Sequence, residues 1–175
     1  MSAEAYRWRC SCCGEEQIGL PMAMGFEGPR PWEYFDDAKQ AESFLNSDFC
    51  KIVRLNGEIE RYVLGILILP VPEIDAEFQF AVWVSVSERS WDIYSAGYGA
   101  GEYKAEGCFG FLANAVPGYG GSSGLHADVW FQPDGLRPLI ALHDGDHPLI
   151  SAQKDGVDLA QVEQWAASIH RNASG

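Results

Sequence analysis

A nearly uninterrupted apolar run in the middle of the chain, Gly65-Ile66-Leu67-Ile68-Leu69, restricts the possible fold more than any other segment. A strand with one face in solvent alternates apolar and polar residues, whereas a strand covered on both faces reads as a continuous apolar run. We therefore expect a central strand here, ended by Pro70 and Pro72. The wider apolar stretch, Val63 to Val71, falls well short of the about 18 residues that a membrane-spanning helix requires.

The dipeptide Asn56-Gly57 lies a few residues before this run, between two segments with strand character, Lys51 to Leu55 and Glu58 to Leu64. Asn-Gly is the pair that best suits a two-residue type I′ turn, because both central residues of that turn have positive φ. The sequence therefore predicts a β-hairpin at this position.

The remaining elements follow mostly as strands separated by Gly, Pro and Asp turns, with little alternation of strand and long helix. This order predicts a single α+β domain over residues 1–175 with a mostly antiparallel sheet, peripheral helices and an N-terminal knuckle-like CxxCG turn. Residues 1–28 form the knuckle and loop segment, and residues 29–175 form the α+β body. The further strands are expected at Phe78 to Val86, Gly107 to Ala113, Leu125 to Gln132 and Pro138 to His143, and the helices at Glu33 to Leu45, Ser87-Glu88 through Tyr94, from His147-Pro148, and Leu159 to His170.

Composition limits the partners and the compartment. The chain of 175 residues is 47% hydrophobic, which is enough to bury a core without disulfides. Its 25 acidic side chains against 12 basic ones give a formal charge of -13, which disfavours nucleic acid and anionic membranes and suits a partner with a basic surface. The odd number of five cysteines, without a basic leader before an apolar segment, predicts a cytoplasmic protein with reduced thiols.

The candidate metal site is the C-x-x-C pair Cys10 and Cys13, followed at once by Gly14. Two thiolates on a tight turn supply half of the four ligands of a structural zinc. We name Cys50 and His147 as candidates for the other two ligands, and expect Cys12 to point away or to act as an adventitious ligand. The alternatives are a cysteine-rich turn packed without metal and a redox dithiol, although a redox pair needs a helix after its first thiol.

A second cluster, His143-Asp144-Gly145-Asp146-His147, places two imidazoles and two carboxylates within five residues. Such a cluster can ligate a divalent metal, so a metal-dependent hydrolase using His143 and His147 is one alternative function. A thiol hydrolase would pair Cys50 or Cys108 with His126 or His147. The cluster also fits a plain Asp-Gly turn followed by a helix cap ahead of Pro148, and we weight that interpretation more heavily.

Two further patterns favour ordinary structural roles. The glycine-rich segment from Gly118 to Gly124 lacks the following helix and the Lys of a phosphate-binding loop, so a flexible hairpin connection is expected. Large aromatic residues on strands pack in a core or on the surface of a sheet more often than they line a ligand cleft. The aromatic residues in question are Trp83, Trp91, Tyr119 and Trp130.

Several short motifs, in this order and spacing, resemble a bacterial family called domain of unknown function 2199. The motifs that carry this resemblance are Trp8-Arg9-Cys10 with Cys13-Gly14-Glu15, Gly19-Leu20-Pro21, Ser47-Asp48-Phe49-Cys50, Trp83-Val84-Ser85-Val86-Ser87, Pro117-Gly118-Tyr119 and Asp146-His147-Pro148-Leu149. The resemblance implies no established reaction. We therefore expect a binding or structural role, with a zinc at Cys10 and Cys13; the alternatives are the hydrolase and an acidic, immunity-type protein that binds a basic partner.

Overall fold

The chain folds into two compact units that alternate along the sequence. The computed structural model describes residues 2–34 and 42–173. Unit 1 comprises Met1–Gly25, Ile68–Phe80 and Gly145–Gly175, and unit 2 comprises Phe26–Leu67 and Ala81–Asp144. The single domain expected over residues 1–175, with its segment 1–28 and body 29–175, stays a prediction.

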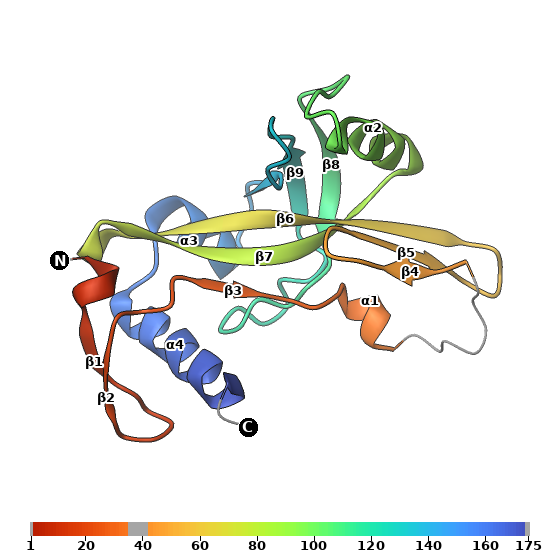
Figure 1. Ribbon diagram of the computed structural model, residues 1–175. Helices are drawn as coiled ribbons and strands as arrows, with labels where there is room; N and C mark the ends of the chain where they lie inside the picture. Colours follow the sequence, from red (N-terminus) through yellow and green to blue (C-terminus); the bar gives the residue numbers. More distant parts are fainter. Residues whose placement is uncertain (1, 35–41, 174–175) are drawn as a thin grey trace. The chain divides into compact units, whose positions relative to one another are not determined.

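Unit 1 begins with a short hairpin, drawn in red in Figure 1, whose two strands pair antiparallel. Its helical part comes from the C-terminal end of the chain. The elements of unit 1 are η1 (Ala3–Ala5), β1 (Arg7–Arg9), β2 (Glu16–Ile18), β3 (Ala23–Gly25), the end of β6 (Ile59–Val71), η3 (Pro72–Ile74), the start of β7 (Ala76–Val86), α3 (Pro148–Asp155) and α4 (Leu159–Ala173).

Aromatic packing holds α4 in unit 1. The ring of Trp165 lies 4.6 Å from that of Phe78 and 4.9 Å from that of Phe80, measured between centroids. On α4, Val162, Trp165 and Ala166 are buried at three- and four-residue spacing, as an amphipathic helix requires. The prediction of a helix from Leu159 to His170 is confirmed, and the helix continues to Ala173.

Unit 2 contains most of the strand pairing. Its elements, besides the first part of β6 and the second part of β7, are α1 (Arg30–Glu33), β4 (Phe44–Leu45), β5 (Phe49–Val53), α2 (Glu88–Tyr98), β8 (Gly107–Leu112), β9 (His126–Trp130) and β10 (Leu139–Leu142). The strand order of the large sheet is β3-β7-β8-β9-β10-β6-β5-β4, with a further pairing of β7 with β6.

This further pairing closes five strands, β6 to β10, into a ring, and the sheet is therefore not wholly antiparallel. β10 runs parallel to β6, with Leu139 beside Ile66 and Ile140 beside Leu67. A chain that reverses direction at each of four connections returns to its starting direction, so the fifth strand of a closed ring meets the first one in parallel. The α+β class is consistent with the structure, but the prediction of a mostly antiparallel sheet missed this closure.

The apolar run lies in β6, as expected, and residues Tyr62 to Gly65 are all buried. Gly65 is needed for the close approach of β10, because a Cβ at this position would lie 2.4 Å from Ile140 Cδ1. The predicted end of the strand is wrong, since β6 continues through Pro70 to Val71.

The hairpin at Asn56-Gly57 is confirmed, but its turn type is not the predicted one. β5 and β6 pair antiparallel on either side of it. Gly57 has a φ of 86°, while Asn56 is not among the described residues with positive φ, so the turn is not type I′. The Gly57 amide donates to Arg54 O at 2.9 Å and the Arg54 amide donates to Glu58 O at 2.8 Å. The loop therefore has three residues, a type I turn followed by a left-handed glycine.

The predicted helices have mixed outcomes. Ser87 caps α2 as expected, its side chain accepting from the Ser90 amide, and the helix runs beyond Tyr94 to Tyr98. The helix predicted from Glu33 to Leu45 falls partly outside the described residues, and its last two positions form β4. Over residues 2–34 and 42–173, none of the helices is long and apolar enough to cross a membrane.

The core of unit 2 is organised around Trp83, whose side chain is 1% exposed. The buried Asn114 joins two segments of backbone there. Its Oδ1 accepts from the Trp83 amide at 2.7 Å, and its Nδ2 donates to Gly28 O at 2.9 Å. Because both backbone groups are away from water, this one side chain satisfies polar groups that would otherwise be unpaired.

Candidate metal centre

The candidate site is the loop that joins β1 to β2. Arg9 is paired with Glu16 at the end of the two-stranded sheet, so residues 10–15 form the connection. The Cys10 amide donates to Glu15 O and the Gly14 amide donates to Cys10 O, both at 2.8 Å. Gly14 has a φ of 75°, a left-handed conformation that glycine adopts without steric cost. These features make a compact knuckle whose three cysteines follow one another on a tight turn.

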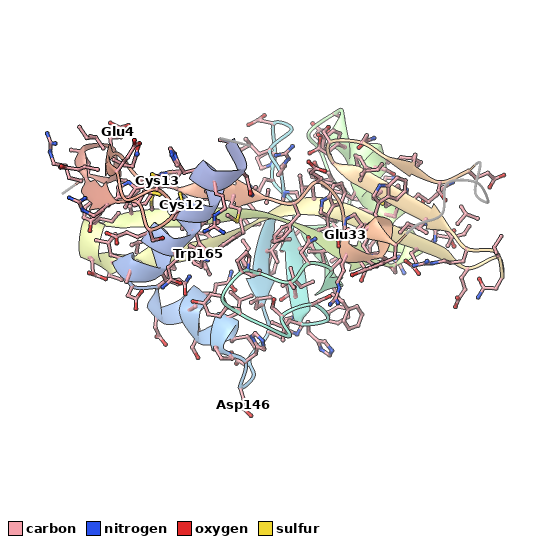
Figure 2. The ribbon with its side chains drawn as sticks, turned by 90° about the horizontal axis from the view of Figure 1, so that it is seen from below. Glu4, Cys12, Cys13, Glu33, Asp146 and Trp165 are labelled. Carbon is pink, nitrogen blue, oxygen red and sulfur yellow. The ribbon has the colours of Figure 1, made fainter. Side chains whose placement is uncertain are left out.

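The knuckle brings together three thiols. The Sγ atoms of Cys10, Cys12 and Cys13 all lie within 4.8 Å of one another, and they are the one such group of potential metal ligands among the described residues. Cys10 Sγ and Cys12 Sγ are 2.9 Å apart. Figure 2 shows Cys12 and Cys13 next to each other on the same loop. Cys10 is buried, Cys12 is half-buried and Cys13 is exposed, so the cluster is reachable from solvent on one side.

The close pair of thiols titrates unevenly. The hydrogen bond from the Cys12 thiol lowers the pKa of Cys10, and the same contact raises the pKa of Cys12 to about 11. Two thiolates at this separation repel each other, so one proton is shared between them unless a cation takes its place. The pair therefore does not carry two negative charges unless a cation such as a metal ion neutralises them.

Contacts within unit 1 fix the base of the knuckle. The Tyr6 hydroxyl donates to Glu163 Oε1 on α4 at 2.8 Å, and the Trp8 indole donates to Gly19 O at 2.9 Å. The Arg9 guanidinium donates to Gly14 O at 2.9 Å, which supports the turn itself. The strands are thereby held on both sides of the thiols, a condition for a preorganised site.

The sequence identified Cys10 and Cys13 but not the third thiol. Cys12 was expected either to point away or to act as an adventitious ligand, and its sulfur lies beside that of Cys10, so it does not point away. The signal was present in the spacing, because Cys10, Cys12 and Cys13 fall within four residues. A C-x-C-C sequence on a turn as tight as this one can direct all three side chains to one side.

The other two predicted ligands are not part of this group. Cys50 is fully buried in unit 2 in a hydrophobic cluster with Ile52, Tyr62 and Leu64, and burial raises the pKa of its thiol to about 12. His147 is the N-cap of α3, where its Nδ1 accepts from the Leu149 amide at 3.2 Å. Their roles as ligands of a metal at Cys10 and Cys13 stay predictions.

The histidine cluster forms the turn and cap that the sequence favoured over a ligand pair. Gly145 and Asp146 lie in the turn before α3, and within unit 1 Asp146 points away from Cys12, Cys13 and Trp165 (Figure 2). His143 is engaged elsewhere, with its Nε2 3.0 Å from Asp128 Oδ1. His143 and His147 thus serve different local structures.

The cysteine and histidine pairs suggested for a thiol hydrolase have separate environments. Cys108 is adjacent on β8 to Phe109, so the two side chains alternate to opposite faces of the sheet. The ring of Phe109 lies 5.4 Å from that of His126. The histidine therefore lies on the face of the strand opposite to Cys108.

The glycine-rich segment and the aromatic residues have mostly the structural roles expected of them. Gly118, Gly121 and Gly124 have positive φ in the connection between β8 and β9. Trp83 is in the core, and the Trp91 ring packs 5.2 Å from that of Phe49. Trp130 lies on the surface of the sheet rather than in a core, since it is on β9 and is 46% exposed.

Comparison with known proteins gives one match. A search of curated proteins and a search of solved structures both find nothing similar. The model of a family described as an uncharacterized protein conserved in bacteria, DUF2199, matches residues 9–157, a segment that begins one residue before the cysteine knuckle. The match confirms the resemblance seen in the sequence motifs: the chain belongs to the DUF2199 family.

Proposed function

We propose that this protein is a metal-binding protein with a structural or binding role, and that its knuckle holds one zinc ion through Cys10, Cys12 and Cys13. The observation that carries the proposal is the convergence of the three Sγ atoms within 4.8 Å. A tetrahedral zinc with sulfur ligands at about 2.3 Å holds them about 3.8 Å apart. This value lies between the 2.9 Å of the Cys10–Cys12 pair and the 4.8 Å limit of the group.

The choice of zinc rests on ligand chemistry. Three thiolates form a soft donor set, which favours zinc and copper(I) over magnesium or calcium. Zinc has no preferred geometry of its own and accepts the short spacing of this loop. Thiols free to bind metal need a reducing compartment, so a cytoplasmic location accompanies the proposal. Cys50 and His147 remain candidates for the fourth ligand.

A structural role for the metal follows from the small amount of burial near the knuckle. Among the described residues of the first 25, the buried hydrophobic side chains are Trp8, Cys10 and Leu20. Short segments with so little apolar burial are commonly ordered by a metal, whose binding free energy then becomes folding free energy. The metal would hold the loop of residues 10–15 in the geometry that its backbone hydrogen bonds define.

The hydrolase alternative has weaker support. His147 Nδ1 already accepts a backbone hydrogen bond, and His143 pairs with Asp128 rather than with a thiol. A nucleophile beside a base is the minimum arrangement for nucleophilic catalysis. The contacts of these two histidines favour structural roles.

Metal content measured by mass spectrometry on protein purified without chelators tests the proposal. We expect about one zinc per chain in the native protein and loss of zinc in Cys10→Ser, Cys12→Ser and Cys13→Ser, because each removes one ligand of a small set. Cys108→Ser is the matched control, since Cys108 is half-buried and outside the group. Circular dichroism of each variant separates loss of a ligand from loss of the fold. A native protein without metal, or one that keeps its zinc in all three knuckle variants, would contradict the proposal.

A further inference from the structure

A group of exposed aromatic and imidazole side chains lies on β8, β9 and β10 in unit 2. We call this surface the aromatic face, and it consists of Phe109, Phe111, His126, Asp128, Trp130 and His143. Phe109, Phe111 and Trp130 are 44%, 40% and 46% exposed. Single exposed apolar residues are common, but a contiguous exposed apolar patch marks an interaction surface.

Ring contacts join four of these residues, Phe109, Phe111, His126 and His143, into one cluster. The Phe109 and Phe111 rings are 4.9 Å apart between centroids, and His126 lies 5.4 Å from the first and 5.0 Å from the second. His143 extends the group, with its ring 5.5 Å from that of Phe109. These rings form an edge-to-face cluster rather than isolated side chains.

The strand register places these residues on one face. Phe111 lies opposite His126, Phe109 opposite Asp128 and Gly107 opposite Trp130. Residues at every second position of a strand point to the same side, so the three pairs form successive rows on that side. In the row of Gly107 and Trp130, β9 has a large side chain and β8 has none.

A pocket lies beside Gly107, at one end of the aromatic face, where β8 has no side chain. This open pocket of about 340 Å³ is lined by Glu106, Gly107, Cys108, Asp128 and Trp130. A Cβ on Gly107 would lie 2.5 Å from Val129 O, so a larger residue does not fit at this position without a backbone shift. The pocket therefore depends on a glycine that the strand pairing itself requires.

The lining of the pocket suits a positive charge. Two of the lining residues, Glu106 and Asp128, are acidic, and a third, Trp130, has the aromatic ring that binds cations best. Asp128 Oδ1 contacts His143 Nε2 at 3.0 Å, but a carboxylate accepts several hydrogen bonds and can also receive a guanidinium. β8, β9 and β10 contain no Lys or Arg, so nothing on these strands competes for the carboxylates.

The charge of the protein also favours one class of ligand for the aromatic face over others. Nucleic acid requires clustered Lys and Arg, which these strands lack. A second copy of this chain carries the same formal charge of -13, so two copies repel each other. A basic protein segment is attracted by that charge, and its apolar side chains can pack on Phe109 and Phe111.

We propose that the aromatic face is the docking site for a basic partner protein, which inserts an arginine or lysine side chain into the pocket lined by Glu106, Asp128 and Trp130 and lays an apolar side chain from two residues away on Phe109 and Phe111. The ligand class is an extended basic segment with a cationic and an apolar residue two positions apart, because residues at every second position of such a segment point the same way. This site is independent of the cysteine knuckle and does not need a metal.

An NMR titration with defined peptides tests the proposal. The probe is an acetylated hexapeptide in which serine separates arginine from leucine, Arg-Ser-Leu-Ser-Arg-Ser, and its control has citrulline, an uncharged isostere, in place of arginine. We expect the arginine peptide to shift the indole N–H signal of Trp130 and to bind at least about tenfold more tightly than the citrulline peptide. Asp128→Asn is expected to weaken binding about threefold or more, and Trp130→Ala by a similar factor.

The matched control is Glu77→Gln, which removes the same charge from an exposed position on β7 in unit 1. Unchanged binding in Glu77→Gln together with weaker binding in Asp128→Asn supports the pocket. Equal weakening in both variants would show a general charge effect and overturn the proposal. A Trp130 signal that does not move would also overturn it, as would a dimer in sedimentation that Phe109→Ser dissociates, because the aromatic face would then belong to a second copy of the chain.

Discussion

Replacing Gly14 with alanine tests whether the left-handed residue shapes the knuckle. Gly14 has a φ of 75°, and an added Cβ would meet nothing within 4 Å, so the substitution adds backbone strain without a collision. Placing an L-residue in this conformation costs about 1–2 kcal/mol. An opening equilibrium of the knuckle should therefore shift by a factor of about 5–30 toward the open form.

The assay is hydrogen exchange at the amides of residues 10 and 14, which are bonded to Glu15 O and Cys10 O at 2.8 Å. Their protection in Gly14→Ala should fall by that factor, because exchange reports local opening. If metal binding requires the closed knuckle, zinc affinity measured against a chromophoric chelator should fall by a similar factor.

Gly99→Ala is the matched control for this experiment. Gly99 also has open space around the added Cβ, but its φ is -79°, which alanine adopts freely. Gly99→Ala should leave both readouts unchanged, and Gly14→Asn should lose less than Gly14→Ala, since asparagine tolerates the left-handed region. Native protection in Gly14→Ala, or equal losses in the two alanine variants, would refute the reasoning.

Two further predictions concern unit 2. Asn114→Leu leaves the buried Trp83 N–H and Gly28 C=O unpaired, so urea unfolding should show a free energy of unfolding lower by about 2–6 kcal/mol. The control Asn56→Leu, at an exposed position, should cost about 1 kcal/mol or less. A loss below about 1 kcal/mol in Asn114→Leu would contradict the role of Asn114 in pairing these two backbone groups. Burial alone would raise the pKa of Asp48, but hydrogen bonds from Ser47, Arg137 and Tyr98 bring it below its usual value. Because the pKa is depressed in the folded state, this carboxylate stabilises the fold above a pH of about 4, and its contribution is lost as the pH falls through the folded value. Unfolding curves between pH 7 and pH 3 should show a smaller acid loss in Asp48→Asn than in the native protein, and parallel curves would contradict the assignment.

Local sequence patterns predicted much of the fold. The apolar run predicted the position of β6, and the residues before Pro148 predicted a helix cap, which His147 provides. These features depend on residues close in sequence, whose periodicity and hydrogen-bonding preferences are strong. The parallel meeting of β10 with β6 joins segments about 70 residues apart, and no local preference encodes such a closure.

The details that the sequence missed depend on backbone geometry. Asn56-Gly57 permits more than one turn, and the one adopted leaves only Gly57 left-handed. Cys12 faces Cys10 because the knuckle closes through Gly14, which the spacing of the cysteines alone does not specify. Trp130 was expected either in a core or on the surface of a sheet, and its alternate position on β9 places it on the exposed side.

X-ray absorption spectroscopy at the zinc edge of the native protein tests the central claim most directly, because it counts the sulfur atoms bound to the metal. Cys10, Cys12 and Cys13 predict three sulfur ligands from the knuckle at about 2.3 Å, and one sulfur ligand fewer in Cys12→Ser that has been loaded with excess zinc to offset its weaker binding. A shell of nitrogen and oxygen alone, or a sulfur count that does not change in Cys12→Ser, would contradict a metal centre in the knuckle.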